Sequence, residues 1–535
     1  MKYSLKCKYL LPLLFVPCIY SCTDNFKDYN MNETEVSDEM LNYDNLRVGG
    51  FIPQIQKDII PTSDEGANEY QRAHHQPNSE NLAGDVYSGY MGAITGFNGN
   101  TNGTTYDFSI RWQDEAFSVA YTKVMPAWKK VAELSKGQNP STYAFVQVLK
   151  VAAMHRITDM YGPIPYSKFG TGSLTTAYDS QEQVYNNLFE ELNEAIEILE
   201  DFVSKYPNSR PLKKFDLMFG GDMSKCLKFA NALKLRLAMR TVYVQPEKAK
   251  SLAEEAVKGL IMTENGDNVF LSSANGVSVF NPIFVCWNTY NDIRMGATIQ
   301  SYLTGYNDSR IAKYFSKSSF DDVEYRGVRS GILINTTAHN NYKNYSSPNI
   351  FANTPVQIMT AAEVSFLRAE GALRGWNMGG TAQEFYEQGI RLSFAQWGAE
   401  LGGYLADDES TPAPFEDAVQ PSYSIKEGNP LIPTITVKWD ESAGFEEKLE
   451  RIITQKWLAV FPDGQEAWSE FRRTGYPKIF PVAVNKSGVV STQEQIRRIP
   501  FPTTEYNNNR AEVEKAVGLL GGADNGGVKL WWDKK

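Results

Sequence analysis

Segments in which an apolar residue recurs every three or four positions limit the fold more than any other feature of this sequence. Between residues 181 and 201, spacings of four and three place the apolar side chains on one face of an amphipathic helix. These side chains are Val184, Leu188, Leu192, Ala195 and Leu199. Either Asp179 or Ser180 stands where a residue would cap the first turn.

Similar segments follow one another in pairs. Residues 224–243 are expected to form a partner helix, and Pro246 is expected to lie in the first turn of a third. The pairing recurs in residues 112–135 with 141–159, and in residues 356–374 with 381–398. Small residues that allow close approach recur on these faces; they are Ala152, Ala153, Ala230, Ala232, Ala361, Ala362, Ala369 and Ala372. The sequence therefore predicts a mainly α fold with tetratricopeptide-like helix pairs, although the period is irregular.

The N-terminus is typical of a secreted, lipid-anchored protein. Three lysines precede the short apolar run of residues 9–19, which is too short to span a bilayer and reads as a signal peptide. Ser21-Cys22 follows directly and resembles the bacterial lipobox, in which the Cys is acylated. We therefore expect a signal peptide at 1–21, a lipidated acidic tether at 22–44 and a helical domain at 45–535. The alternative is an ordinary signal peptide, with Cys22 incidental.

Charge and motif content exclude several classes of function. The formal net charge is −10 and the mature chain has no basic cluster, which argues against binding to nucleic acid. The four histidines and the cysteines lack metal-ligand spacing, so we expect no metal site and no cofactor. Cys226 and Cys286 have apolar neighbours and are expected to be buried free thiols. No nucleophile elbow, zinc-protease motif or phosphate loop occurs, so we do not expect an enzyme.

Long segments rich in Gly, Asn, Ser, Pro and aromatic residues interrupt the helical pattern. They are residues 76–108, 265–347 and 401–439. Loops of this length inside a compact domain are uncommon and usually functional. We expect them to be irregular and to carry the ligand site.

Four stretches of sequence resemble one known family. Residues 81–90 read Asn-Leu-Ala-Gly-Asp-Val-Tyr-Ser-Gly-Tyr, and residues 156–166 read Arg-Ile-Thr-Asp-Met-Tyr-Gly-Pro-Ile-Pro-Tyr. The third stretch runs from Trp457 to Phe471-Arg-Arg-Thr-Gly-Tyr-Pro477, and the fourth from Arg498 to Trp531-Trp532. In order and spacing they resemble the SusD/RagB family, in the branch with the Asn-Leu-Ala-Gly-Asp motif.

This resemblance implies both a fold and a role. Members of the family are α-helical, with about four tetratricopeptide-like helix pairs. They cover a SusC-like TonB-dependent transporter in the outer membrane, bind glycans or in some cases peptides, and pass them to that barrel. The resemblance thus implies a lipid-anchored outer-membrane protein that faces the cell exterior. A ligand-free structural lid remains an alternative.

Two clusters in the loops have the chemistry of a sugar site, in which rings stack on C–H faces and polar groups bond to hydroxyls. The first consists of Asp85, Tyr87, Tyr90 and Phe97, and the second of Trp287, Tyr290, Asn291 and Arg294. Tyr87 and Tyr90 are three residues apart, so they also fit one helix face packed into the core. Trp287 follows three apolar residues that could draw it into the core. An oligopeptide ligand would depend instead on backbone hydrogen bonds.

Overall fold

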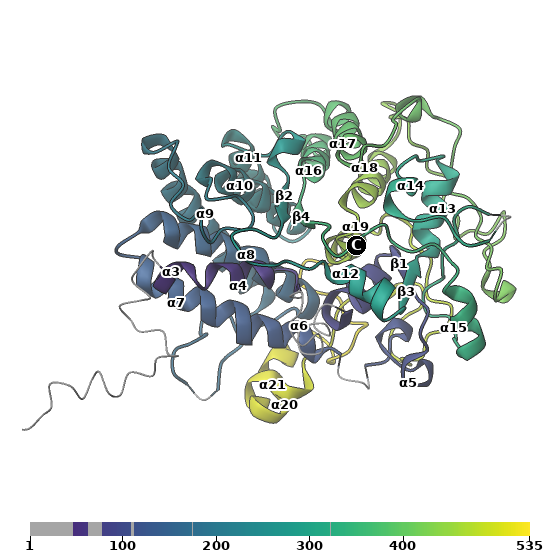
Figure 1. The fold of residues 1–535 in the computed structure, drawn as a ribbon, viewed down its shortest axis with the longest axis horizontal. Helices are drawn as coiled ribbons and strands as arrows, with labels where there is room; N and C mark the ends of the chain where they lie inside the picture. Colours follow the sequence, from purple (N-terminus) through teal and green to yellow (C-terminus); the bar gives the residue numbers. More distant parts are fainter. Residues whose placement is uncertain (1–45, 63–76, 109–111, 174, 321–322) are drawn as a thin grey trace, which may run out of the picture. The chain divides into compact units, whose positions relative to one another are not determined.

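Helices make up most of the secondary structure in the computed structural model (Figure 1). The structure describes residues 46–62, 77–108, 112–173, 175–320 and 323–535. Residues 48–535 form one compact unit. The predicted signal peptide and tether, with Cys22, lie outside the described residues. Of the helices in the described ranges, none combines the length and apolar composition needed to cross a bilayer.

The scaffold consists of helices packed in sequence order, as the periodicity predicts. α7 packs on α8, α8 on α9, α9 on α10, and α10 on α11, while α16 packs on both α17 and α18, and α18 on α19. Their bounds are α4 (Ile52–Lys57), α7 (Met125–Ser135), α8 (Pro140–Tyr161), α9 (Gln181–Lys205), α10 (Met223–Arg240), α11 (Pro246–Lys258), α16 (Ala361–Leu373), α17 (Ala382–Trp397), α18 (Phe445–Val460) and α19 (Gly464–Thr474). The predicted fold class is confirmed.

Local signals in the sequence explain several of these helices. In α9 the five predicted apolar residues are all fully buried. The hydroxyl of Ser180 accepts a hydrogen bond from the backbone N–H of Gln183 and caps this helix. Asp179 instead accepts hydrogen bonds from Ser167 in the preceding loop. Pro246 occupies the first turn of α11, as expected.

Two predicted helices are interrupted. Residues 356–374 were expected to be helical throughout, but Val356–Met359 forms strand β4, and α16 begins only at Ala361, capped by Thr360. Val356 and Ile358 alternate with polar or flexible neighbours, which suits a strand better than a helix. Residues 112–135 are divided into α6 (Asp114–Val119), a π-helical turn η4 (Ala120–Val124) and α7.

The segments predicted to be irregular contain short regular elements. The first holds η2 (Pro77–Asp85), β1 (Met91–Ala93), α5 (Phe97–Asn100) and η3 (Gly103–Thr105). The second holds η5 (Asn265–Asp267), β2 (Val269–Leu271), α12 (Pro282–Phe284), η6 (Val285–Thr289), β3 (Ile293–Met295), α13 (Ala297–Gly305), α14 (Ile311–Tyr314) and α15 (Thr336–Tyr342). The third holds only η7 (Tyr404–Ala406) and η8 (Pro421–Tyr423), and α20 (Thr503–Asn508) and α21 (Arg510–Leu519) follow near the C-terminus.

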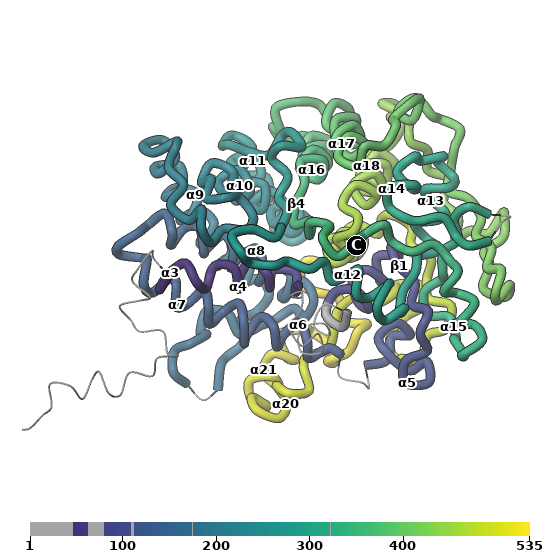
Figure 2. The backbone as a smooth tube through the Cα atoms, in the orientation of Figure 1, coloured from purple at the N-terminus to yellow at the C-terminus, as the bar shows by residue number. Residues whose placement is uncertain are grey.

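Two small antiparallel sheets tie these segments together. β1 pairs with β3, with Gly92 opposite Arg294, and β2 pairs with β4. Figure 2 shows β1 and the elements around α5 and α15 on the same side of the fold, away from α9 to α11. The β1–β3 pair therefore places the two predicted ligand clusters next to each other.

A network of buried charges joins the helices of the second half to α10. Arg240 of α10 bonds to Glu466 and Glu470 of α19, and Arg473 of α19 bonds to Glu370 of α16 and to Glu470. Removing one partner from such a network leaves a buried charge without compensation, at a cost of ~3–5 kcal/mol. The network therefore helps to specify how these helices meet.

Candidate functional site

Most of the first predicted cluster lies in the core and cannot contact a ligand. Asp85, Tyr87 and Tyr90 are 3%, 5% and 0% exposed. The hydroxyl of Tyr90 donates a hydrogen bond to the carbonyl of Trp457, and the Tyr87 ring lies 5.1 Å from that of Trp468. The expectation that these three residues bind ligand is corrected, because Trp468 and Trp457 cover the two tyrosine rings and the backbone of Gly464 covers Asp85.

The motif around Asp85 forms a tight backbone contact. The carboxylate of Asp85 accepts hydrogen bonds from the side chain of Asn81 at 2.7 Å and from the backbone N–H of Gly464 at 3.1 Å. A Cβ on Gly464 would lie 2.4 Å from the Cα of Asp85, and a Cβ on Gly84 would lie 2.7 Å from the backbone N of Gln465. η2 and the start of α19 thus meet backbone to backbone, and burial raises the pKa of Asp85 well above its usual range.

The C-terminal motif is equally structural. Arg472 donates hydrogen bonds to the carbonyl of Asp159, in the last turn of α8, and to that of Arg497. Arg473 pairs with Glu370 and Glu470 rather than with helix carbonyls. Gly475, with φ 77°, ends α19 in the left-handed region.

The second cluster surrounds the π-helical turn η6 and strand β3. Arg294 is 4% exposed and donates to the carbonyls of Lys343, Trp287 and Ile293 and to the side-chain oxygen of Asn291. Burial lowers the pKa of this guanidinium to about 10. The expectation that Arg294 bonds to a ligand is corrected, because its donors are directed to these protein oxygens. Its contacts make it a positioning residue for the turn that carries Trp287.

Four aromatic side chains meet at the surface beside this turn. We call Phe280, Phe284, Trp287 and Phe351 the aromatic cluster. Their rings contact edge to face, with neighbouring centroids 5.8, 5.6 and 6.5 Å apart. Phe351 is 53% exposed. The other three are half-buried, so the cluster has an apolar face that solvent can reach.

Trp287 is held firmly within this cluster. Its indole N–H donates a hydrogen bond to the carbonyl of Ile350 at 2.8 Å, and its ring is half-buried. Tyr290 and Asn291 are also half-buried, and Asn288 and Thr289 are exposed. The local rings and polar groups that we predicted from the sequence therefore lie together at the surface, and their contact with a ligand stays a prediction.

The remaining residue of the first cluster, Phe97, begins α5, a few residues after strand β1. Phe97 is half-buried, with its ring edge-to-face with Trp112 at 5.0 Å. The hydroxyl of Thr95 donates to the carboxylate of Asp292 at 2.7 Å and joins this segment to the second cluster. Burial raises the pKa of Asp292 to about 6.

A cavity of about 190 Å³ adjoins the aromatic cluster. Ile350, whose carbonyl receives the Trp287 N–H, is part of its wall, and so is Asn281, which caps α12. Its wall consists of Phe270, Asn281, Ile350, Thr354, Pro355, Gln357, Gln396, Trp397 and Pro462. We call it the neutral cavity, because none of these side chains carries a charge.

Nothing in the described ranges resembles a metal centre, since no three His, Cys, Asp or Glu side chains are grouped to hold an ion. His74 and His75 lie outside those ranges. Cys226 and Cys286 are buried and form no disulfide, as expected.

The comparison that decides the family covers almost the whole chain. A family profile described as SusD-like, Susd and RagB outer membrane lipoprotein, matches residues 28–533. The chain belongs to the SusD/RagB family. A chitin-binding SusD homologue from Flavobacterium johnsoniae is 41% identical, with a TM-score of 0.85 over 91% of this chain and 99% of that one. No curated protein sequence matches.

Further solved SusD homologues agree with this assignment. One from Bacteroides uniformis is 40% identical and one from Bacteroides thetaiotaomicron is 38% identical, each with a TM-score of 0.82. Each alignment covers 91% of this chain and 99% of the other. The SusD-like fold is thus shown for nearly the full length.

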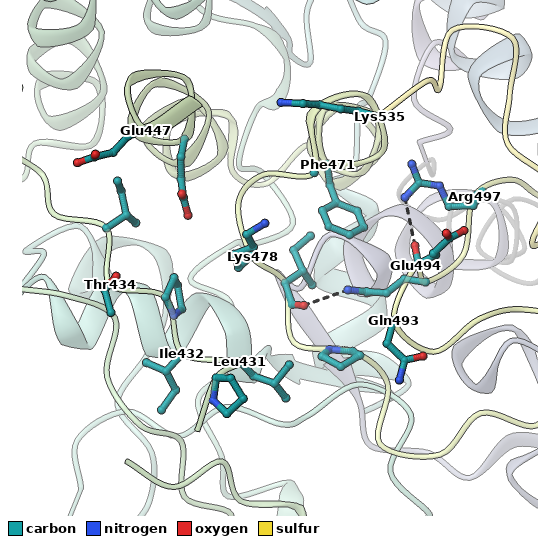
Figure 3. A pocket seen from close by; sticks show the side chains of 18 of the residues that line it. Leu431, Ile432, Thr434, Glu447, Phe471, Lys478, Gln493, Glu494, Arg497 and Lys535 are labelled. Atoms are coloured by element: carbon teal, nitrogen blue, oxygen red, sulfur yellow. Dashed lines mark hydrogen bonds between the residues drawn. The ribbon is translucent and has the colours of Figure 1, made fainter. Parts of the chain in front are cut away.

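This SusD-like chain also has a larger groove, of about 1170 Å³, near its C-terminus (Figure 3). We call it the C-terminal groove. Leu431, Ile432 and Thr434 lie along one wall, and Phe471 and Lys478 lie between them and Arg497. Among the described residues that line it, Phe471 is the one aromatic, and it is 7% exposed. The groove therefore lacks the ring faces that a stacked sugar needs.

Proposed function

We propose that this protein captures oligosaccharides at the cell surface and delivers them to a SusC-like TonB-dependent transporter in the outer membrane. The observation that carries the proposal is the aromatic cluster, whose rings form a half-exposed apolar face bordered by Asn288 and Asn291. Rings of this kind stack on the C–H faces of sugars, and side-chain amides bond to hydroxyls. The chitin-binding homologue supports the same class of ligand.

In this proposal the lipid on Cys22 holds the protein to the outer membrane, facing the exterior. The partner barrel is inferred from the family alone. Solubilising the native membrane in detergent and isolating the protein is expected to recover a TonB-dependent barrel. The purified protein without its lipid is expected to bind the same barrel in detergent. Recovery of the protein without any barrel would contradict the partnership.

Phe351 provides the sharpest test of the binding surface. Because Phe351 is 53% exposed, Phe351→Ala is expected to leave stability nearly unchanged. It should weaken oligosaccharide binding by ~2 kcal/mol, or about 30-fold, if the ring is a binding hot spot. Val489, which is 62% exposed, provides a matched control, and Val489→Ala should change neither property.

Isothermal titration with a panel of neutral oligosaccharides, chitin oligosaccharides among them, measures the effect. Equal affinities for the two variants would remove the aromatic cluster from the binding surface. The same titrations, followed by chromatography of the ligand, test the proposal that the protein binds glycans without cleaving them. Cleavage that is lost on replacing one carboxylate would indicate an enzyme instead.

One observation favours an oligopeptide as the second candidate ligand. Glu450 lines the C-terminal groove and is half-buried, and its carboxylate has no hydrogen bond or ion pair with another described residue. Burial raises the pKa of this carboxyl, although Lys478 opposes the effect. Thr434 and Ile435 keep their backbone N–H groups unpaired within the described chain, as a peptide bound by backbone hydrogen bonds would need.

A casein digest separates the two candidates. If peptides are the ligands, the parent protein binds them and Glu450→Gln weakens binding of those with basic groups, whereas Phe351→Ala has no effect. We expect the opposite outcome, with no measurable binding of the digest.

A further inference from the structure

The neutral cavity has a chemistry different from that of the aromatic cluster beside it. The two share a boundary, because Ile350 lines the cavity and accepts the hydrogen bond from Trp287. Asn281 lines the cavity and directly follows Phe280 of the cluster. A ligand that lies across the rings therefore has the cavity within reach of one of its substituents.

The size of the cavity limits what can enter it. A volume of about 190 Å³ corresponds to about six waters, at ~30 Å³ for each water. Sites for whole drug-sized ligands usually enclose ~300–1,000 Å³. The cavity thus admits a substituent or the end of a ligand, and the rest of the ligand must lie outside it.

The wall of the cavity excludes charged substituents. Its nine residues are all uncharged. A charge moved from water into a site without a partner is strongly penalised. Carboxylate, sulfate and ammonium groups are therefore poor occupants.

Most acceptor atoms of the wall are already occupied. Asn281 Oδ1 accepts from the N–H of Ile283 at 3.1 Å, Gln357 Oε1 from Gln396 Nε2 at 2.7 Å, and Thr354 Oγ1 from the N–H of Phe351 at 2.9 Å. Asn268 donates to the side-chain oxygen of Gln396 at 3.3 Å. A donor group on a ligand would find few free partners here.

Donor hydrogens, in contrast, remain unused. The buried indole N–H of Trp397 has no partner within the described chain. The Thr354 hydroxyl accepts one bond and donates none, and the amide nitrogen of Gln396 has two hydrogens and donates one. A buried unpaired donor requires an explanation, and a ligand carbonyl would provide one.

The rest of the wall is apolar. Phe270, Ile350, Pro355 and Pro462 are placed to contact a methyl group rather than a hydroxyl. The occupant that satisfies all these conditions is small and neutral, with a carbonyl oxygen and a methyl group. We propose that the neutral cavity binds the acetamido substituent of an N-acetylated sugar in an oligosaccharide held by the aromatic cluster. This inference rests on the proposed function.

Three β-1,4-linked pentasaccharides test the inference, because they differ only at carbon 2: the pentamers of N-acetylglucosamine, glucosamine and glucose. In titrations of the parent protein, the acetylated pentamer is expected to bind tightest, with an affinity at least tenfold higher than that of the glucose pentamer. The glucosamine pentamer should bind most weakly, because none of the described residues that line the cavity has a carboxylate. Equal affinity for the acetylated and glucose pentamers would overturn the inference while leaving oligosaccharide capture intact.

The other outcomes also decide the matter. Tightest binding of the glucosamine pentamer would indicate that the ammonium group at carbon 2 binds the carboxylates of Glu80 and Asp85. These two side chains line a 30 Å³ space that shares Asn281 and Gln357 with the cavity. That result would overturn the acetamido assignment. Failure of all three pentamers to bind, together with failure of the wider oligosaccharide panel, would overturn the proposed function as well.

Variants locate the effect within the cavity. Trp397→Phe keeps a ring but removes the unpaired N–H, and it is expected to weaken binding of the acetylated pentamer about five- to tenfold. Binding of the glucose pentamer should not change. Gln396→Glu replaces the donor amide with a carboxylate. It should abolish the preference for the acetylated pentamer over the glucose pentamer. Trp531→Phe, at a half-buried Trp outside the cavity, is the control and should change neither affinity.

A purely structural role of these residues would lower both affinities together. The ratio of the two affinities is therefore the decisive readout, with melting temperatures measured to confirm folding. An unchanged ratio in both Trp397→Phe and Gln396→Glu would remove the cavity from ligand recognition.

Discussion

Replacing Trp287 by Ala tests whether the aromatic cluster serves the core or a ligand. A fully buried Trp cut to Ala costs ~3–5 kcal/mol of stability. Trp287 is half-buried, donates one hydrogen bond to Ile350 and contacts the rings of Phe284 and Phe351, so we expect about half that cost, ~2 kcal/mol.

The size of the protein determines which assay can detect such a loss. The entropy of unfolding at the melting temperature is ~2.1 cal/mol/K per residue. The compact unit that begins at Val48 therefore has an unfolding entropy of ~1 kcal/mol/K in total. A loss of 2 kcal/mol then lowers the melting temperature by only about 2 °C. Denaturant titration, which gives the free energy of unfolding directly, is the better measurement.

Glycan titration on the same variants provides the second readout. Trp287→Ala and Tyr290→Ala are expected to lose ~2 kcal/mol of affinity or more, about 30-fold. Trp287→Phe retains a ring while losing the bond to Ile350, so its affinity should fall less than its stability. If Trp287→Ala and Tyr290→Ala both bind as tightly as the parent, these residues are not ligand contacts and the C-terminal groove becomes the better candidate.

Three further predictions concern stability and anchoring. Gly464→Ala should destabilise the protein by ~1–3 kcal/mol or more, because the added Cβ would overlap Asp85. Gly518 in helix α21 has open space around its Cβ position, so Gly518→Ala should stabilise the protein by up to ~1 kcal/mol. Denaturant titration of both variants measures these changes in the free energy of unfolding. Burial raises the pKa of Asp292 from 3.8 to about 6, so the folded state binds a proton at this carboxyl more tightly than the unfolded state does. The protonated carboxyl therefore contributes its full stabilisation below pH ~4, and this contribution is lost as the pH rises to ~6. Asp292→Asn should therefore gain up to ~3 kcal/mol at pH 7 and flatten that part of the stability profile, and an unchanged profile would refute the assignment. Cys22→Ala should abolish metabolic labelling with a fatty acid, and retained label would show that Cys22 is not the lipid site.

The helices of the scaffold were predictable because their signals are local. The face of α9 and its Ser180 cap are contained within about 25 residues of sequence. Strand β4 was missed because its partner β2 lies nearly 90 residues earlier, and no local pattern specifies that pairing. The alternation of Val356 and Ile358 covers only four residues directly before α16, so it is too short to be distinguished from a continuation of the helical pattern, and periodicity alone extends the helix too far.

The candidate site was only partly predictable for the same reason. Trp287 and Phe284 are close in sequence, but Phe351, the most exposed ring of the cluster, is 64 positions from Trp287. Tyr87 and Tyr90 have the composition of a sugar site, yet Trp468 and Trp457 cover them from the far end of the chain. The alternative reading, in which two tyrosines three residues apart pack into the core, agrees with the structure.

The family resemblance and the proposed ligand surface depend on different residues. Asp85 and Tyr90 in the N-terminal motif bond to Gly464 and Trp457 in the C-terminal one, and all four are buried. Such contacts specify how η2 meets α18 and α19, and they do so whatever ligand is bound. Membership of the SusD/RagB family therefore predicts the scaffold. The ligand choice that we propose would depend instead on exposed or cavity-lining positions, and Phe351 and the neutral cavity are the ones that the structure makes testable.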